Sequence, residues 1–164
     1  MKKQYANPKE LSVPRFYTHA VSVEGASKLV TISGQVSWDA SGNVVGKNDM
    51  RAQSEQVFRN VTAALQAAGA GWDDVIKMNG YMVGMHAERV NAYREVRSRF
   101  LKEGALPAST LVGVERLVDP DLLLEVEVLA ALGPARKPSP KKKKKIRRRR
   151  IRPTAGWWSA RPSP

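Results

Sequence analysis

The period of the apolar residues changes several times between residues 17 and 132, and this pattern limits the possible folds more than any other feature of the chain. Residues 17–23 and 28–36 are rich in β-branched and aromatic side chains, and a Glu-Gly-Ala-Ser segment at 24–27 separates them. Two such runs around a short turn are typical of a β-hairpin. The domain is therefore predicted to begin with two paired strands.

Two later segments have helical spacing. The first is predicted over residues 53–68, with Asn48 or Asp49 as its cap and Gly69 as its left-handed stop. The second is predicted over residues 87–102. The apolar residues that recur at this spacing are Val57, Phe58, Val61, Leu65 and Ala68 in the first segment, and Val90, Tyr93, Val96, Phe100 and Leu101 in the second.

Further strands complete the pattern. A short strand is predicted at Val44-Val45, a longer one at 74–83, and two more within 107–128 around an Asp-Pro-Asp turn at 119–121. The main elements then follow the order β-β-α-β-α-β-β, which predicts an α+β domain with two helices on one face of a mixed sheet. The other face of the sheet is left without helices and needs a partner.

The net charge of +13 belongs to one end of the chain. Of the 28 Lys and Arg residues, 13 lie in residues 134–164, which contain no Asp or Glu, so residues 1–133 balance 15 basic against 15 acidic side chains. A chain of 164 residues suits one domain with an appendage. We therefore expect an α+β domain at 1–133 and a disordered, strongly basic tail at 134–164.

The tail has two interpretations. Its cationic block from Lys141 to Arg152, followed by Trp157-Trp158, suits nucleic acid or an anionic surface through charge and stacking. The alternative is a slipped purine repeat after a natural end near Leu132, because the codons AAG for lysine and AGA for arginine are two frames of one repeat. The residues predicted to contact nucleic acid are Lys141, Lys143, Lys145, Arg147, Arg149 and Arg152.

Several classes of function are excluded by what the sequence lacks. It has no cysteine, so disulfides, thiolate catalysis and Cys-ligated metal are excluded. His19 and His86, the two histidines, show no metal-ligand spacing. Phosphate loops, dinucleotide fingerprints and nucleophile elbows are absent, so no cofactor is expected. No apolar run follows the N-terminal lysines and no segment is long enough to span a bilayer, so a cytoplasmic location is expected.

Two carboxylates draw attention on the last predicted strand. Glu125 and Glu127 are two positions apart, so they point to the same face of the strand. Acidic residues are depleted in strands, yet apolar residues bracket both of these. Either the pair faces solvent or an interfacial cation, or one of the two faces a water-accessible cavity as a general acid–base group.

Three motifs occur in a fixed order along the domain. They are Phe-Tyr-Thr-His-Ala at 16–20, Ile-Ser-Gly-Gln-Val at 32–36, and Pro-Ala-Ser-Thr-Leu-Val through Leu-Glu-Val-Glu-Val at 107–128. In order and spacing they resemble the Rid (reactive intermediate deaminase) family, and the likeness covers residues 12–132. The resemblance implies a chorismate-mutase-like fold, a homotrimer with sites in clefts between subunits, and deaminase activity on 2-iminobutanoate or 2-iminopropanoate.

The resemblance also assigns the two main site positions. Glu127 matches the family's catalytic carboxylate. Active members carry Pro-Ala-Arg-Ser, whose arginine binds the carboxylate of an imino acid, and Ser109 stands in its place here. A hydroxyl lacks the charge and the bidentate fork of a guanidinium. Losing the arginine contact therefore costs about 1.5–3 kcal/mol of carboxylate binding. Ser109 and Thr110 either offer hydroxyls to a ligand or satisfy nearby backbone groups.

Four further positions are candidates for ligand contact. Tyr17 and Gly34 match ligand-lining positions of the family, although a core aromatic residue and a close-packed glycine are equally simple readings. Arg94 or Asn91 matches a site-lining asparagine, depending on the alignment of the second helix. Arg94 is then either a compensating anion contact or a surface arginine.

Two functions follow. The first is a Rid-like trimer that is a weak or altered imine/enamine deaminase, and thus a hydrolase, or a non-catalytic binder of a small carboxylate, imine or enamine metabolite. The second is a trimeric scaffold that presents basic tails to nucleic acid.

Overall fold

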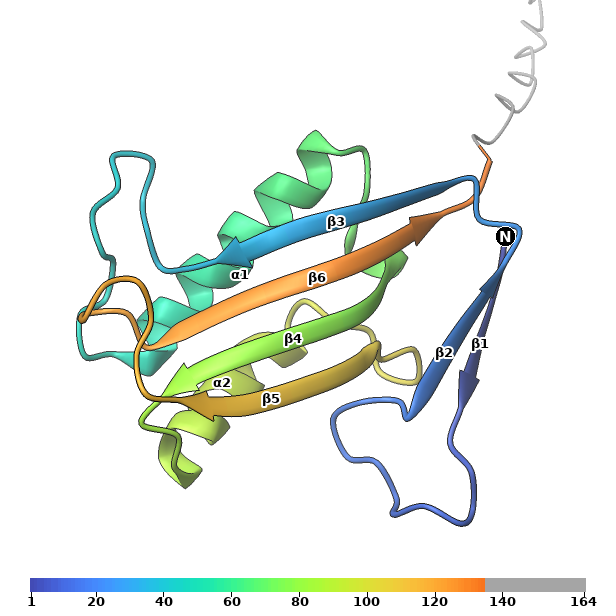
Figure 1. The fold of residues 1–164 in the computed structure, drawn as a ribbon, viewed down its shortest axis with the longest axis horizontal. Helices are drawn as coiled ribbons and strands as arrows, with labels where there is room; N and C mark the ends of the chain where they lie inside the picture. Colours follow the sequence, from blue (N-terminus) through green and yellow to red (C-terminus); the bar gives the residue numbers. More distant parts are fainter. Residues whose placement is uncertain (135–164) are drawn as a thin grey trace, which may run out of the picture.

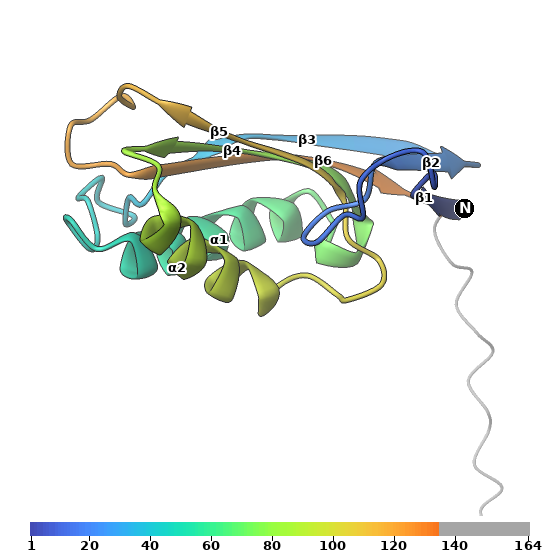
Figure 2. The same cartoon turned by 90° about the horizontal axis from the view of Figure 1, so that it is seen from below.

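The computed structural model describes residues 1–134, and residues 135–164, with the nucleic-acid contacts predicted there, lie outside the described residues. The described part has two layers. Figure 1 shows a sheet in front of two helices, and Figure 2 shows both helices on the same side of that sheet. The predicted α+β class, with both helices on one face, is confirmed. Among residues 1–134, no helix combines the length and apolarity that a bilayer crossing requires.

The main sheet contains four strands. They are β3 (Lys28–Gln35), β4 (Val75–Val83), β5 (Ala108–Val114) and β6 (Leu124–Leu132), in the spatial order β3-β6-β4-β5. β6 runs antiparallel to both β3 and β4, whereas β4 and β5 are parallel. Parallel neighbours require a crossover connection, which α2 (Ala87–Ser98) supplies. The sheet is therefore mixed, as predicted.

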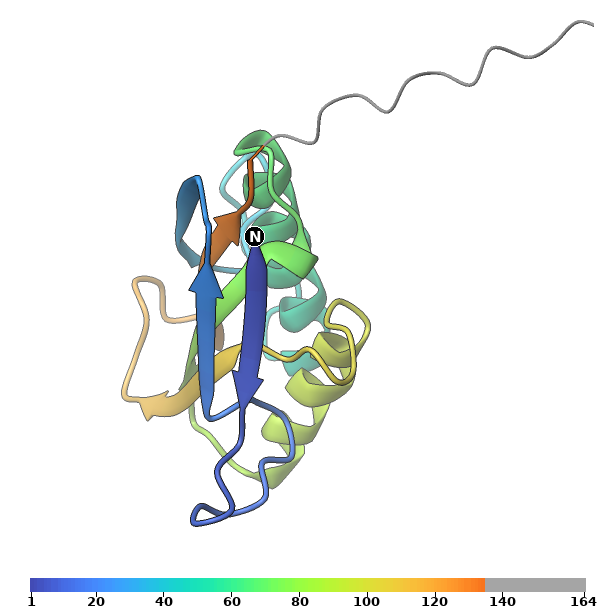
Figure 3. The ribbon, with the colours of Figure 1, turned by 90° about the vertical axis from the view of Figure 1, so that its right-hand side faces the viewer.

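The N-terminal strands pair differently from the prediction. An unpredicted strand, β1 (Lys2–Ala6), pairs antiparallel with β2 (Ala20–Glu24) in a separate two-stranded sheet. The predicted hairpin between β2 and β3 is wrong, because β2 pairs with β1 in one sheet and β3 pairs with β6 in the other. Figure 3 looks onto the β1–β2 pair at the end of the main sheet where β3 begins. The predicted strand at Val44-Val45 is reduced to one bridge between Trp38 and Val44.

The first helix begins and ends close to the predicted residues. α1 (Met50–Ala67) is capped by Asp49, whose side chain accepts from two backbone N–H groups of the first turn. Asn48 instead takes a φ of 59°, and Gly69 ends the helix with a φ of 75°. α2 is shorter than predicted and stops at Ser98, while the short 3₁₀ helix η1 (Trp72–Asp74) leads into β4.

Apolar packing between the layers holds the helices on the sheet. Phe58 of α1 is fully buried and stacks on Trp72 and Phe100 at centroid distances of 5.3 and 5.0 Å. A fully buried polar residue, Gln53, fixes the loop before β6. Its Nε2 donates to the Asp121 carbonyl at 2.7 Å, and its Oε1 accepts from the Leu123 amide at 2.8 Å. The position at which β6 starts is therefore set by α1.

Candidate functional site

The face of the main sheet that carries no helix, called here the open face, holds the candidate site. Along β6 buried residues alternate with half-buried ones, and Glu125 and Glu127 both belong to the half-buried set. Since alternate side chains point to opposite faces, the two carboxylates share the open face, as predicted. The residues of the neighbouring strand β4 on the same face are Lys77, Asn79, Tyr81 and Val83.

Glu127 is oriented by two donors from β4. Asn79 Nδ2 donates to Glu127 Oε1 at 2.7 Å, and the Tyr81 hydroxyl donates to the same oxygen at 3.0 Å. Asn79 pairs directly with Glu127 in the ladder, and Tyr81 is its diagonal neighbour. Within residues 1–134, the second oxygen, Oε2, receives no hydrogen bond. The carboxylate is thus held by one oxygen and keeps the other available.

Tyr81 stays a proton donor at neutral pH. Its hydrogen bond to the Glu127 carboxylate raises the pKa of Tyr81, and burial and the charges of Glu127 and Glu125 act in the same direction. A tyrosine with an ordinary pKa near 10 is already protonated at pH 7. The contact from Tyr81 to Glu127 is therefore a neutral O–H donating to a carboxylate.

A small hollow of about 120 Å³ opens beside this carboxylate. Its lining includes one carboxylate, Glu127, and one ammonium group, Lys77. Lys77 Nζ donates to Thr110 Oγ1 of β5 at 2.8 Å, so the predicted site residue Thr110 also lies on the open face. The complete lining is Thr31, Ile32, Lys77, Asn79, Glu127, Val128 and Leu129.

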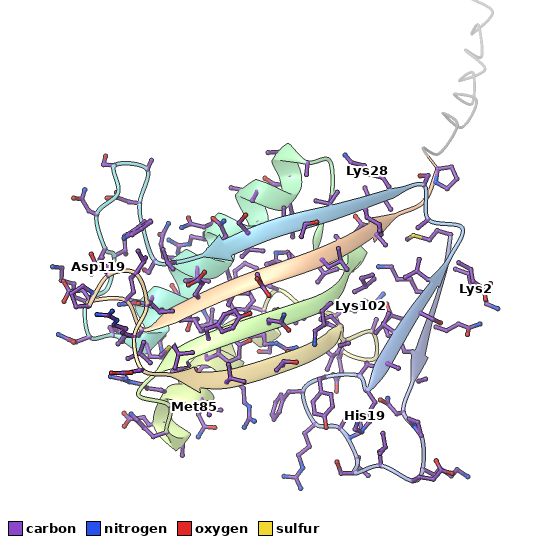
Figure 4. The ribbon with its side chains drawn as sticks, viewed as in Figure 1. Lys2, His19, Lys28, Met85, Lys102 and Asp119 are labelled. Carbon is purple, nitrogen blue, oxygen red and sulfur yellow. The ribbon has the colours of Figure 1, made fainter. Side chains whose placement is uncertain are left out.

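Gly34 makes room for the other carboxylate. A Cβ atom at Gly34 would lie 1.7 Å from Glu125 Oε1. The pairing of β3 with β6 also shifts between Ile32 and Gln35, at this glycine. Gly34 therefore permits the close approach of Glu125 rather than of Glu127. Glu125 also lines a larger hollow beside the β5–β6 loop. Figure 4 labels Asp119 in this loop, at one end of the sheet, and Lys28 at the other end.

The remaining predicted residues lie around the β5 edge and the N-terminal loop. The Arg94 guanidinium of α2 stacks over the Phe16 ring at 4.3 Å, and Tyr17 packs edge-on against His19 at 5.1 Å. Ser109 precedes Thr110 on β5, so by alternation its side chain faces the helix layer. Figure 4 shows the loop that carries His19 beyond β5. Within one subunit, these residues are not gathered around Glu127.

Asn91, the alternative to Arg94, lies in a third place. It lines an open hollow of about 980 Å³ between the N-terminal ends of α1 and α2. Arg51 and Glu95 form an ion pair across this hollow. Neither alignment of the second helix therefore brings its residue to the Glu127 hollow of the same subunit.

Three functional candidates were not predicted from the sequence: Lys77, Asn79 and Tyr81. A signal was present, because these residues alternate with Met78 and Gly80 in the predicted strand at 74–83. Polar and aromatic residues at every second position indicate a strand with one uncovered face. Their position beside Glu127, however, depends on the pairing of β4 with β6.

Comparisons with known proteins identify the family of the chain. The family described as Endoribonuclease L-PSP matches residues 8–132. A RutC family protein from Synechocystis sp. is 30% identical over 118 residues, covering 71% of this chain and 85% of the relative. A RutC family protein from Pyrococcus horikoshii is 34% identical over 115 residues, covering 70% of this chain and 85% of that protein.

Two further relatives are a protein with a named activity and a solved structure. A 2-iminobutanoate/2-iminopropanoate deaminase from Dermatophagoides farinae is 30% identical over 101 residues, covering 62% of this chain and 74% of that protein. The crystal structure of a Rid family protein of unknown function from Yersinia pestis is similar with a TM-score of 0.71 and 34% identity, covering 80% of this chain and 100% of that one. The family match and these relatives show that the chain belongs to the Rid family, whose matching family model carries the description Endoribonuclease L-PSP.

Proposed function

We propose that the protein hydrolyses small reactive imines or enamines, with Glu127 as the group that handles the proton of the attacking water. The observation that supports this proposal is the geometry of Glu127. Asn79 and Tyr81 both donate to Oε1, while the carboxylate lines a hollow on the open face. A carboxylate held in one orientation with a free oxygen is suited to general acid–base catalysis.

The chemistry can be written with all atoms accounted for. Water adds through its oxygen to the carbon of the protonated imine while Glu127 Oε2 takes one water proton, and a neutral carbinolamine forms. Glu127 returns this proton to the nitrogen. The remaining hydroxyl proton then passes to Glu127 as the C–N bond breaks and its electron pair leaves with ammonia, so a ketone remains. An enamine enters the same sequence after protonation at its carbon terminus.

Turnover of amino-acid-derived imines is expected to be weak. Ser109 stands where the resemblance places an arginine, and a serine supplies no charge to a substrate carboxylate. Binding of a small metabolite without turnover is the second form of this proposal. Nucleic-acid binding rests on the tail alone, which lies outside the described residues, and no contact within residues 1–134 favours it.

The functional unit is proposed to be a homotrimer. The helices cover one face of the sheet, and the open face exposes apolar residues, including Leu29 at 65%. Tyr17 and Arg94 lie around the β5 edge of the same subunit, away from the Glu127 hollow. A cleft between subunits would bring the edge of one subunit to the open face of the next.

The test is the hydrolysis of 2-iminobutanoate, followed as ammonia release above the spontaneous rate. Glu127→Gln is expected to lower kcat by roughly 100-fold, the usual contribution of a general acid–base group. Glu125→Gln is the matched control, since it removes the same charge two residues away on the same strand and face. Equal and small losses in both variants would make Glu127 a structural residue.

A further inference from the structure

The lysine side chains in the described part of the chain differ in what holds their amines. Lys3 and Lys28 donate to backbone carbonyls, and Lys47 forms an ion pair with a carboxylate. Lys77 is different, because its Nζ donates to a hydroxyl, Thr110 Oγ1, at 2.8 Å and because it lines the hollow beside the candidate carboxylate. Lys77 is therefore an amine that shares a hollow with an acid–base group.

The amine of Lys77 is oriented without being paired to a carboxylate. Among the described residues, no Asp or Glu forms an ion pair with it. An ion pair keeps the proton on an amine, whereas nucleophilic attack needs the lone pair of the neutral form. Thr110 accepts one N–H of Lys77, so Nζ is oriented by a group that carries no charge. Lys77 is thus suited to act as a nucleophile.

Glu127 is placed to move the protons that such a reaction requires. It is the diagonal neighbour of Lys77 on the open face, because it pairs in the ladder with Asn79, two residues further along β4. Diagonal neighbours lie roughly 7–8 Å apart, so both side chains can reach one small molecule between them. Glu127 Oε1 accepts from Asn79 and Tyr81, while Oε2 receives no hydrogen bond within residues 1–134. This second oxygen is available to take up a proton and return it.

We propose a second activity at this hollow, in which Lys77 forms a Schiff base with short aldehydes and Glu127 transfers the protons. The Nζ lone pair adds to the carbonyl carbon, and the π pair of the C=O bond moves to the oxygen. Glu127 takes one proton from the nitrogen and gives it to this oxygen, which yields a neutral carbinolamine. The nitrogen lone pair then expels the hydroxyl, which leaves as water with the second nitrogen proton, again carried by Glu127. A C=N bond between Lys77 and the former aldehyde remains.

The hollow indicates which carbonyl compounds fit. Its volume of about 120 Å³ favours short chains, and Leu129 adds an apolar side chain on the same face for an alkyl group. Aldehydes are less hindered than ketones at the carbon that Nζ attacks. The inference shares Glu127 with the proposed function, but it does not require that the protein hydrolyses an imine.

Covalent trapping on the full chain tests this inference. The protein is incubated with dilute butanal and sodium cyanoborohydride, which reduces a Schiff base to a stable secondary amine, and peptide mass spectrometry follows the adduct at each lysine. Trapping at Lys77 is expected to be about tenfold or more faster than at Lys102, an exposed lysine after α2, because a positioned acid–base group contributes roughly 100-fold or more. Glu127→Gln is expected to lower the rate at Lys77 to that at Lys102 and to leave Lys102 unchanged.

Two further variants complete the test. Glu125→Gln removes the same charge two residues away on the same face and is expected to keep the fast trapping at Lys77. Lys77→Arg keeps the positive charge without a primary amine and is expected to lose the fast phase of butanal uptake, while the slow phase at the other lysines stays. Circular dichroism verifies that each variant is folded.

The outcomes separate this inference from the proposed function. Equal rates at Lys77 and Lys102, or a fast rate at Lys77 that Glu127→Gln does not change, would overturn the inference. Butanal is added directly, so a failure to hydrolyse 2-iminobutanoate would remove the proposed function and leave fast trapping at Lys77 as support for the second activity. Hydrolysis that depends on Glu127, together with slow trapping at Lys77, would remove the second activity alone.

Discussion

At the residue scale, two donors on one oxygen of Glu127 distinguish this site from a carboxylate that merely faces solvent. The position of Glu127 on the same face as Glu125 could be predicted, because their period-2 relation is local in sequence. Asn79 and Tyr81 could not, because their contacts depend on how β4 is paired with β6. A shift of that pairing by one residue would turn both side chains to the other face.

The hydroxyl of Tyr81 provides the first prediction. Tyr81→Phe removes one of the two donors that orient Glu127 and keeps the ring. A hydrogen bond to a charged group contributes about 1.5–3 kcal/mol, so kcat for 2-iminobutanoate is expected to fall by roughly tenfold with KM nearly unchanged. Tyr5→Phe in β1 is the matched control. Equal kcat values in the two variants would show that Asn79 alone orients the carboxylate.

Gly34 provides a second prediction at this scale. In Gly34→Ala the new Cβ meets Glu125 Oε1 at 1.7 Å, so the Glu125 side chain must move. The expected cost is about 1–3 kcal/mol of unfolding free energy, measured in urea.

The double variant Gly34→Ala/Glu125→Ala decides the cause of that cost. With the clash removed, adding Gly34→Ala to Glu125→Ala is expected to cost less than about 0.5 kcal/mol, a clear non-additivity. An unchanged cost in the double variant would mean that the backbone at Gly34, and not Glu125, requires a glycine.

At the scale of elements, the sequence predicted the helix ends, which depend on nearby residues, but not the pairing of the N-terminal strands. The start of α1 at Asp49 and its end at Gly69 follow from cap chemistry, which acts within a few residues. The partner of β2 could not be predicted, because two β-branched runs around a turn are compatible both with a hairpin and with strands that pair elsewhere. The sequence did not predict β1, because Lys2–Ala6 contains a single aromatic residue and little apolar alternation.

The contact between the two helices yields a pH prediction. Glu95 of α2 pairs with Arg51 of α1 and with Arg99, which also reaches Glu55. These partners, Arg51 first, lower the pKa of Glu95 from 4.5 to about 2. A carboxyl whose folded pKa is depressed stabilises the fold above its unfolded pKa and loses that contribution as the pH falls toward the folded value.

Glu95→Gln is therefore expected to be less stable than the unaltered chain at pH 7, with a difference that shrinks between pH 4.5 and 2. Urea unfolding at pH 7, 4 and 3 measures this difference in unfolding free energy. Salt at about 1 M should reduce the difference at pH 7, because Glu95 and its arginine partners are exposed. Glu103→Gln is the control, since Glu103 forms no ion pair among the described residues. A difference that is constant with pH would assign the effect to something other than ionisation.

Arg97 of α2 gives the fourth prediction. It is 4% exposed, and its Nη2 has no hydrogen-bond partner within residues 1–134. Burial lowers the pKa of Arg97, with Tyr93 one turn earlier opposing this effect. Arg97→Met keeps the length without the charge and is expected to raise the unfolding free energy by about 1 kcal/mol. A loss of more than about 2 kcal/mol would instead indicate an anionic partner in the assembled protein or in a ligand.

At the scale of the whole molecule, the candidate residues fall into two groups. Glu127 and Lys77 lie on the open face, whereas Tyr17 lies in the N-terminal loop against His19. The sequence placed both groups in one site through the resemblance, but a single subunit does not gather them. Only an assembly in which the edge of one subunit meets the open face of the next can join them. Such a head-to-tail contact closes into a ring when its rotation allows.

Mixed subunits provide the test of this assembly. Residues 1–134 are expected to form a trimer by light scattering, and a stable monomer at micromolar concentration would contradict the shared cleft. Glu127→Gln and Tyr17→Ala are each expected to have little activity alone. When they are unfolded together in equal amounts and refolded, a shared cleft draws its Glu127 and its Tyr17 from different subunits. Random assembly then gives about a quarter of the clefts both native residues, so about a quarter of the activity returns. If both residues served one cleft from the same subunit, no mixture would regain activity.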